Sequence, residues 1–149
     1  MHFQQWLKTG DTMKIMDLTK KDEFDLLLAC VRGEAEGEAF WGKLAVACVV
    51  RNRVFDKRWA DNYKDVLLQP KQFSCFLPGY FRPELFKREW NEIWWRECKF
   101  AAWGVMYGYV RDITQGATHY YSTALIDPPY WTEGKHPAFR TGDHCFYVL

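Results

Sequence analysis

The segment RGEAEGEAF, Arg32–Phe40, joins two apolar stretches and carries three glutamates within nine residues. Before it, KKDEFDLLLACVRGE has apolar residues at the three- and four-residue spacing of a helix over 20–34. After it, EAFWGKLAVACVVRNRVF predicts a second helix over 38–55. Gly33 and Gly37 weaken helix propensity between the two. The sequence therefore predicts two buried helices joined by an acidic turn, with Asp17 or Thr19 as the first N-cap.

Glu34 falls at or near the C-terminus of the first predicted helix. The helix macrodipole there disfavours negative charge and raises the pKa of a carboxyl group. A carboxyl group that stays protonated near neutral pH can act as a general acid, and flanking glycines let a ligand approach the backbone closely. The same glutamates also suit a solvated turn, so the local sequence leaves both interpretations open.

Composition narrows the class of protein. The 149 residues suit one domain, 1–149, with a polar N-terminal arm over 1–19. A net charge of +1 gives no reason to expect nucleic-acid binding, and no apolar run reaches the roughly 18 residues of a membrane span. The aromatic share of 18% exceeds what a small core needs, so some rings are expected to line a groove. Five cysteines without a Cys-x-x-Cys pair predict buried free thiols made in a reducing compartment, and no secretory signal is visible.

The rest of the chain predicts a mixed architecture. We expect a short helix over 62–69, an extended segment over 72–76 and a long helix over 84–109. Strands are expected over 117–122 and 144–149, with a tight turn at Thr141-Gly142-Asp143 before the second. Helices followed by a small antiparallel sheet define an α+β fold.

Two further segments carry candidate site residues. In QPKQFS, Gln72 and Ser74 share one side of an extended segment, which suits binding of a sugar. An ordinary edge strand with polar residues would have the same pattern. In GATHYYS, His119 and Tyr121 share one face of a strand and Tyr120 lies on the other, which suits either a sugar-stacking wall or an ordinary strand.

Other chemistries find less support in the sequence. The tail residues His119, His136, His144 and Cys145 lack a zinc-binding spacing, so neither metal nor cofactor is expected. There is no Gly-x-Ser-x-Gly elbow, and apart from the histidines, which the sequence does not place, nothing would lower the pKa of the Cys75 thiol.

Four ordered motifs together resemble the cell-wall hydrolase family that includes the spore cortex-lytic enzymes. They are Gly-Glu-Ala-x-Gly-Glu at 33–38 followed by Asn-Arg-Val at 52–54, Gln-Pro-x-Gln-Phe-Ser at 69–74, Gly-Ala-x-x-Tyr-Tyr at 116–121, and Gly-x-His-x-Phe-Tyr at 142–147. The resemblance covers roughly 22–149. Glu36 departs from it, because the family often has Arg there.

The resemblance implies a lysozyme-like fold and a lytic transglycosylase that cuts peptidoglycan between N-acetylmuramic acid and N-acetylglucosamine. Glu34 matches the catalytic acid. Burial near Trp41 and Phe73, the helix end and the charges of Glu36 and Glu38 are expected to raise its pKa. The substrate-binding residues expected are Glu38, Gln72, Phe73, Ser74, His119, Tyr120 and Tyr121.

The expected setting is a monomeric bacteriophage endolysin that stays in the host cytoplasm until the membrane is permeabilised, or else a virion-associated enzyme. Three alternatives remain. The first is a hydrolytic muramidase that uses Glu38, Asp112 or Asp143 as a second carboxylate. The others are a non-catalytic peptidoglycan-binding module and a thiol or zinc peptidase.

Overall fold

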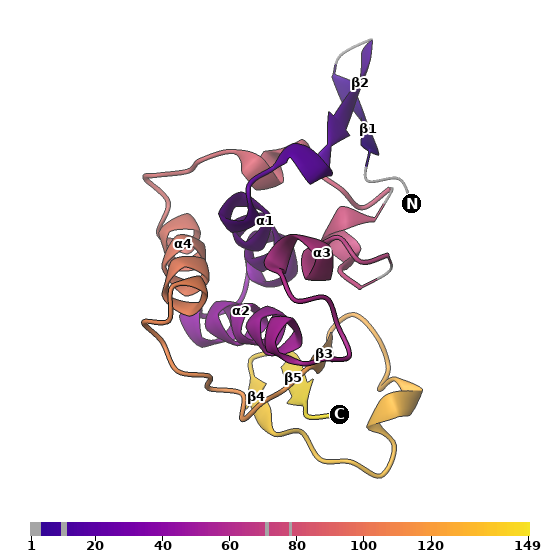
Figure 1. The fold of residues 1–149 in the computed structure, drawn as a ribbon, viewed down its shortest axis with the longest axis vertical. Coiled ribbons are helices and arrows are strands. Elements are labelled where there is room, and N and C mark those ends of the chain that lie inside the picture. Colours follow the sequence, from indigo (N-terminus) through magenta and orange to yellow (C-terminus); the bar gives the residue numbers. More distant parts are fainter. Residues whose placement is uncertain (1–3, 10–11, 71, 78) are drawn as a thin grey trace.

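An antiparallel hairpin opens the fold. The computed structural model describes residues 4–9, 12–70, 72–77 and 79–149, with the side chains of 4–16 excepted. Strands β1 (Gln4–Thr9) and β2 (Thr12–Asp17) pair in the segment predicted as an arm, of which residues 1–3 and 10–11 lie outside the described part. The hairpin projects from one end of the molecule, and the 3-10 turn η1 (Leu18–Lys20) connects it to the helices (Figure 1).

Three helices follow close to their predicted positions. They are α1 (Glu23–Ala35), α2 (Phe40–Phe55) and α3 (Tyr63–Leu67). The predicted cap of α1 was wrong, because the Asp22 carboxylate accepts the Phe24 N–H at 2.8 Å. Asp17 instead caps η1 by accepting the Thr19 N–H at 3.0 Å.

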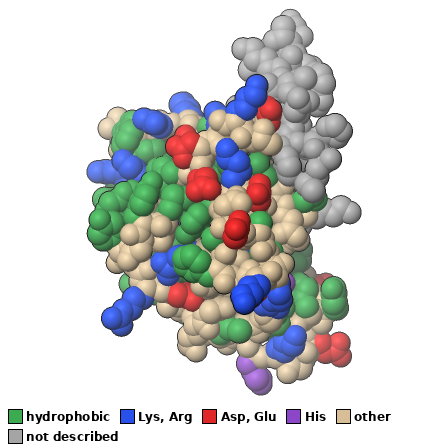
Figure 2. Space-filling model, viewed as in Figure 1, with side chains coloured by type: hydrophobic (Ala, Val, Ile, Leu, Met, Phe, Trp, Pro, Cys, Tyr) green, Lys and Arg blue, Asp and Glu red, His purple; other side chains and the backbone are tan. Residues whose placement is uncertain are grey.

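The long helix predicted over 84–109 is broken. Its first part is the 3-10 turn η3 (Pro83–Phe86), and α4 covers only Ile93–Met106. The Arg32 guanidinium from α1 donates to the backbone carbonyls of Glu84 and Lys87, the latter at 2.8 Å. The Glu84 carbonyl also accepts the Lys87 N–H at 2.9 Å, so this segment forms a single 3-10 turn that Arg32 ties to α1. Hydrophobic side chains gather on the molecular surface over α4 (Figure 2).

The chain ends in a three-stranded antiparallel sheet of order β3-β5-β4. Its strands are β3 (His119–Ser122), β4 (Phe139–Thr141) and β5 (His144–Tyr147), and the 3-10 turn η4 (Tyr130–Thr132) lies in the loop before β4. The predicted turn at 141–143 and the two predicted strands, now β3 and β5, are confirmed, whereas β4 was not predicted. The strand expected at 72–76 is wrong, because the 3-10 turn η2 spans Ser74–Phe76.

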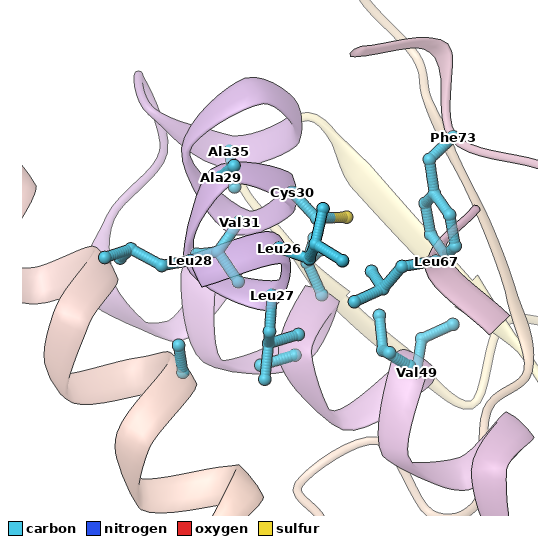
Figure 3. Close-up of a cluster of buried hydrophobic side chains, with 14 of the residues drawn as sticks. Leu26, Leu27, Leu28, Ala29, Cys30, Val31, Ala35, Val49, Leu67 and Phe73 are labelled. Carbon is cyan, nitrogen blue, oxygen red and sulfur yellow. The ribbon is translucent and has the colours of Figure 1, made fainter. Parts of the chain in front are cut away.

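Helix α1 is the centre of the core. Figure 3 shows Leu28 pointing toward α4, while Leu26 and Cys30 point toward Leu67 of α3 and Phe73. All five of these side chains are buried. A helix that is apolar on every side must be surrounded, which explains why α2, α3 and α4 pack around α1. The predicted α+β class, mainly helical with a small antiparallel sheet near the C-terminus, is confirmed.

Within the described part of the chain, no helix combines the length and the apolar character needed to cross a membrane.

Candidate active site

Glu34 lies in the last turn of α1 and opens onto a groove of about 370 Å³. The opposite wall comes from β3 and β5, and the remaining side comes from η2 and its flanking residues. The lining residues are Gly33, Glu34, Gln72, Ser74, Leu77, Tyr120, Tyr121, Ser122, Leu125, Ile126 and His144. Among the described residues that line this groove, Glu34 is the one carboxylate.

Burial raises the pKa of the Glu34 carboxyl group above its ordinary value. Hydrogen bonds act in the opposite direction without cancelling this effect. The Ser74 hydroxyl lies 3.4 Å from Oε2 of Glu34, and the Tyr120 hydroxyl also hydrogen-bonds to the carboxylate. Burial and the charge of Glu34 hold the pKa of Tyr120 well above its usual range, so Tyr120 remains a donor.

Three side chains that were expected to raise the pKa of Glu34 make their contacts elsewhere. Glu36 faces Arg82 at 3.5 Å and Arg32 at 3.8 Å. Glu38 bonds to His144, and Trp41 is largely exposed beside a separate hollow formed with β4. The pKa of Glu34 is therefore raised by burial and not by like charges, which corrects the expectation from the sequence.

A close contact between Gly33 and Cys75 brings η2 to the end of α1. A Cβ atom on Gly33 would lie 2.4 Å from Cβ of Cys75, a distance that real side chains do not reach. Glycine thus allows Cys75 to pack directly on the helix backbone, which places the neighbouring Ser74 beside Glu34. This packing, made by residues 42 positions apart in the chain, explains why the local β-propensity of 72–76 is overridden.

Arg53 of α2 joins two walls of the groove, a role that was not predicted. Its Nε donates to the carbonyl of Thr118 at 2.7 Å, and its Nη1 donates to the side-chain carbonyl of Gln72 at 2.9 Å. The guanidinium is buried and lies 5.3 Å from the Phe73 ring centroid. Its signal was in the sequence, since Arg53 continues the buried stripe of Ala45 and Val49 at four-residue spacing.

Gln72 and Ser74 line the groove, but Phe73 does not. Its side chain is buried in the core next to Arg53. The structure therefore separates Phe73 from the two polar residues with which it was grouped as substrate-binding.

Behind the groove, Glu38 holds His144. His144 is buried and Glu38 is half-buried, and Nδ1 of His144 lies 2.8 Å from Oε1 of Glu38. Gly142, in the turn before β5, leaves room for this carboxylate, because a Cβ there would lie 2.1 Å from Oε2 of Glu38. His144 reaches the groove lining and Glu38 does not. Glu38 thus meets the groove only through its contact with His144.

The two faces of β3 have different surroundings. Tyr120 faces the helices, and its ring lies 5.6 Å from that of His144. His119 faces the other way, with its ring 5.9 Å from Trp59 and 5.3 Å from Trp131. His119 is absent from the groove lining, contrary to its predicted place, and burial lowers its pKa to about 4. Tyr121 borders the groove although its ring packs against Trp131.

The other chemistries that the sequence left open gain no support from the described residues. In this part of the chain, no three His, Cys, Asp or Glu side chains are grouped as metal ligands would be. Cys75 is buried against Gly33, away from solvent. Asp112 accepts hydrogen bonds from Asn52, Thr114 and Gly116 and is thereby committed to holding its own loop.

The fold is shared with two solved bacterial structures, both of them catalytic domains. The catalytic domain of the Bacillus cereus SleB protein has a TM-score of 0.66 and 24% identity, covering 83% of this chain and 88% of that one. The catalytic domain of the germination-specific lytic transglycosylase SleB from Bacillus anthracis has a TM-score of 0.67 and 22% identity, covering 94% and 98%.

Comparison of the sequence with known proteins shows the family to which the chain belongs. A family model described as cell wall hydrolase matches residues 37–147, so the chain belongs to the cell wall hydrolase family. The spore cortex-lytic enzyme of Halalkalibacterium halodurans is 28% identical over 127 residues, and that of Bacillus subtilis is 27% identical over 127; each alignment covers 84% of this chain. The aligned part is about a third of the length of these relatives, 34% and 37% respectively. The family match begins just after Glu34.

Proposed function

We propose that this chain degrades peptidoglycan by cleaving the β-1,4 bond between N-acetylmuramic acid and N-acetylglucosamine as a lytic transglycosylase. The family and the names of its relatives, spore cortex-lytic enzymes and a lytic transglycosylase, support the substrate. One observation carries the reaction type: a single half-buried carboxyl group with a raised pKa lines the described groove.

In the first step, the Glu34 carboxyl group donates its proton to the glycosidic oxygen as the bond to C1 of the muramic residue breaks. The raised pKa favours the protonated form of this group, which is the form that a general acid needs. Once the proton has left, the Ser74 and Tyr120 hydroxyl groups stabilise the carboxylate by hydrogen bonding.

In the second step, the Glu34 carboxylate acts as a base. It removes the proton from the C6 hydroxyl of the same muramic residue, whose oxygen attacks C1 and closes a 1,6-anhydro ring. The proton taken up restores the acid form, so one carboxyl group serves both steps and no water is consumed. Gln72, held by Arg53, and Ser122 border the groove, which supports a role for both in contacting the sugar hydroxyl and N-acetyl groups.

The alternative is a hydrolytic muramidase, which generally needs a second carboxylate to activate water or form an adduct. Glu38 is bound to His144, and Asp112 is bound within its own loop. Neither of these, nor Asp143, is part of the groove lining. This arrangement favours the transglycosylase over the muramidase.

Mass spectrometry of digested peptidoglycan tests the proposal. We expect muropeptides with 1,6-anhydromuramic ends, whereas reducing ends that carry an added water would show a muramidase. Glu34→Gln should fold normally and lose activity by at least about a hundredfold, the typical contribution of general acid–base catalysis. Equal activity in that variant would remove Glu34 from the mechanism. Binding to sacculi without any cleavage by the native chain would show a non-catalytic module.

We also propose that the enzyme acts as a monomer in host-cell lysis by a bacteriophage, folding in the host cytoplasm and reaching the wall after the membrane is permeabilised. Five buried free cysteines support folding in a reducing compartment. Bacteria that express the chain should keep their turbidity until a membrane-permeabilising agent is added, and then lyse. Lysis without that agent would contradict this sequence of events, and association of the chain with phage particles would support the virion alternative.

A further inference from the structure

The outward side of α4 carries a second hollow, of about 300 Å³, lined by Trp90, Arg96, Lys99, Phe100 and Trp103. We name these five residues the α4 aromatic face. None of them lines the Glu34 groove, which is built from other elements. Figure 2 shows hydrophobic side chains gathered over this helix.

Helix α4 is apolar on both of its sides. Its inner side packs small residues such as Cys98, Ala101 and Ala102 against the core. On its outer side, Phe100 is 65% exposed and Trp103 is 42% exposed. A surface helix of a globular protein normally turns polar residues outward, and a contiguous exposed apolar patch marks an interaction site.

The aromatic rings and cations of this face are ordered. Trp103 stacks on Tyr109 with ring centroids 4.5 Å apart and planes inclined by 5°. The Lys99 ammonium lies 4.2 Å from the centroid of Trp90. Among the described residues, neither Arg96 nor Lys99 forms an ion pair with a carboxylate, so both cations are available to an anionic partner.

We propose that the α4 aromatic face is a second binding surface for the glycan strand of peptidoglycan, an inference that rests on the proposed function. The apolar faces of sugar rings and N-acetyl methyl groups suit Trp103 and Phe100. The carboxylates of the muramic lactyl group and its stem peptide suit Arg96 and Lys99. The hollow therefore offers both kinds of contact that this polymer can make.

Two cations lie among the aromatic rings of this hollow. Arg96 and Lys99 are both lining residues, together with Trp90, Phe100 and Trp103. Carboxylates along a glycan strand pair with these cations while its sugar rings stack on the aromatic side chains. This match of charge and apolar contact favours the glycan as the occupant.

Two sites that bind one polymer act together. Once the α4 aromatic face holds a strand, the Glu34 groove meets neighbouring strands at a raised effective concentration, which strengthens attachment to the wall without new contacts in the groove. The surface is thus expected to matter for insoluble sacculi and not for short soluble fragments.

The test measures binding to purified sacculi in the Glu34→Gln background, so that the wall is not digested. Trp103→Ala and Lys99→Glu should each weaken binding by about tenfold, a modest share of the gain from a second site. Tyr130→Ala and Lys57→Glu are matched controls at exposed positions outside the hollow and should bind as the background does. Unchanged binding in both test variants would overturn the proposal.

Other occupants give different results. Binding to phosphatidylglycerol vesicles that is lost with Trp103→Ala, while sacculus binding persists, would assign the face to a membrane and overturn the proposal. A concentration-dependent dimer in sedimentation that Trp103→Ala abolishes would assign it to a second copy, with the same consequence. With Glu34 intact, both test variants should cleave short soluble glycans at the native rate; a native chain that binds sacculi but cleaves nothing would defeat the proposed function alone.

Discussion

Substituting Gly33 by alanine tests whether the packing of α1 on η2 builds the active site. The added Cβ would meet Cβ of Cys75 at 2.4 Å, and ordinary contacts begin at 3.4 Å, so the two backbones must separate by 1.0 Å. Overpacking of this kind costs about 1–3 kcal/mol, against a gain of up to about 1 kcal/mol from the better helix propensity of alanine. We expect a net loss of about 1–2 kcal/mol, which lowers Tm by about 2–8 °C.

The same displacement should impair catalysis. Ser74 precedes Cys75, and its hydroxyl is already 3.4 Å from Oε2 of Glu34, so a further 1.0 Å breaks the hydrogen bond. Misplacement by about 1 Å can cost a hundredfold in rate, and we expect kcat to fall by about 10- to 100-fold. The assays are thermal unfolding followed by circular dichroism and release of muropeptides from sacculi.

Gly37→Ala is the matched control, because a Cβ at Gly37 would have no heavy atom within 4 Å. Cys75→Gly removes the opposing Cβ, so the double variant Gly33→Ala/Cys75→Gly should recover part of the lost activity. If Gly33→Ala matched Gly37→Ala in both Tm and kcat, the contact would not organise the site and the reasoning would be refuted.

Three further predictions concern protonation and the groove walls. Activity should fall as pH rises through the raised pKa of Glu34. Ser74→Ala removes a hydrogen bond that lowers this pKa, so the alkaline limb of the pH–rate profile should move to higher pH. A limb that stays fixed would speak against this role of Ser74. His119 has a pKa of about 4 in the folded chain and 6.5 ordinarily, so between these values the unfolded chain binds more protons and stability falls as the pH drops. The Tm of His119→Phe should therefore fall less from pH 7 to 4.5 than the Tm of the native chain. Equal falls in the two proteins would contradict the lowered pKa of His119. Arg53→Met leaves the Thr118 carbonyl without its donor at a cost of about 1–3 kcal/mol and frees Gln72, so both Tm and kcat should drop, whereas a loss of Tm alone would make Arg53 purely structural.

Features that depend on local pattern could be predicted from the sequence. The periodic apolar stripes predicted α1 and α2 to within a few residues, and the predicted turn at 141–143 is the turn between β4 and β5. The position of Glu34 in the last turn of α1 followed from Gly33 and Gly37, because glycines mark where helix propensity fails. These features need no information about distant parts of the chain.

Features that depend on distant contacts could not be predicted in this way. Local propensity favoured a strand around Ser74 and a helix through Lys87. The chain instead forms the 3-10 turns η2 and η3 there, where it contacts Gly33 and Arg32 of α1. The same limit explains His119. Alternation along a strand puts His119 and Tyr121 on one face, but it does not say that Tyr121 borders the groove while His119 packs against Trp131.

The five cysteines have a consequence for how the fold responds to the redox conditions around it. All five are unpaired and buried in the core or beneath the sheet. Because the fold contains no disulfide bond, it needs no oxidant to form and does not lose stability when a reductant is added. Thiols hidden from solvent are also poor targets for peroxide. The same molecule should therefore keep its shape on both sides of a bacterial envelope, where the redox potential changes abruptly.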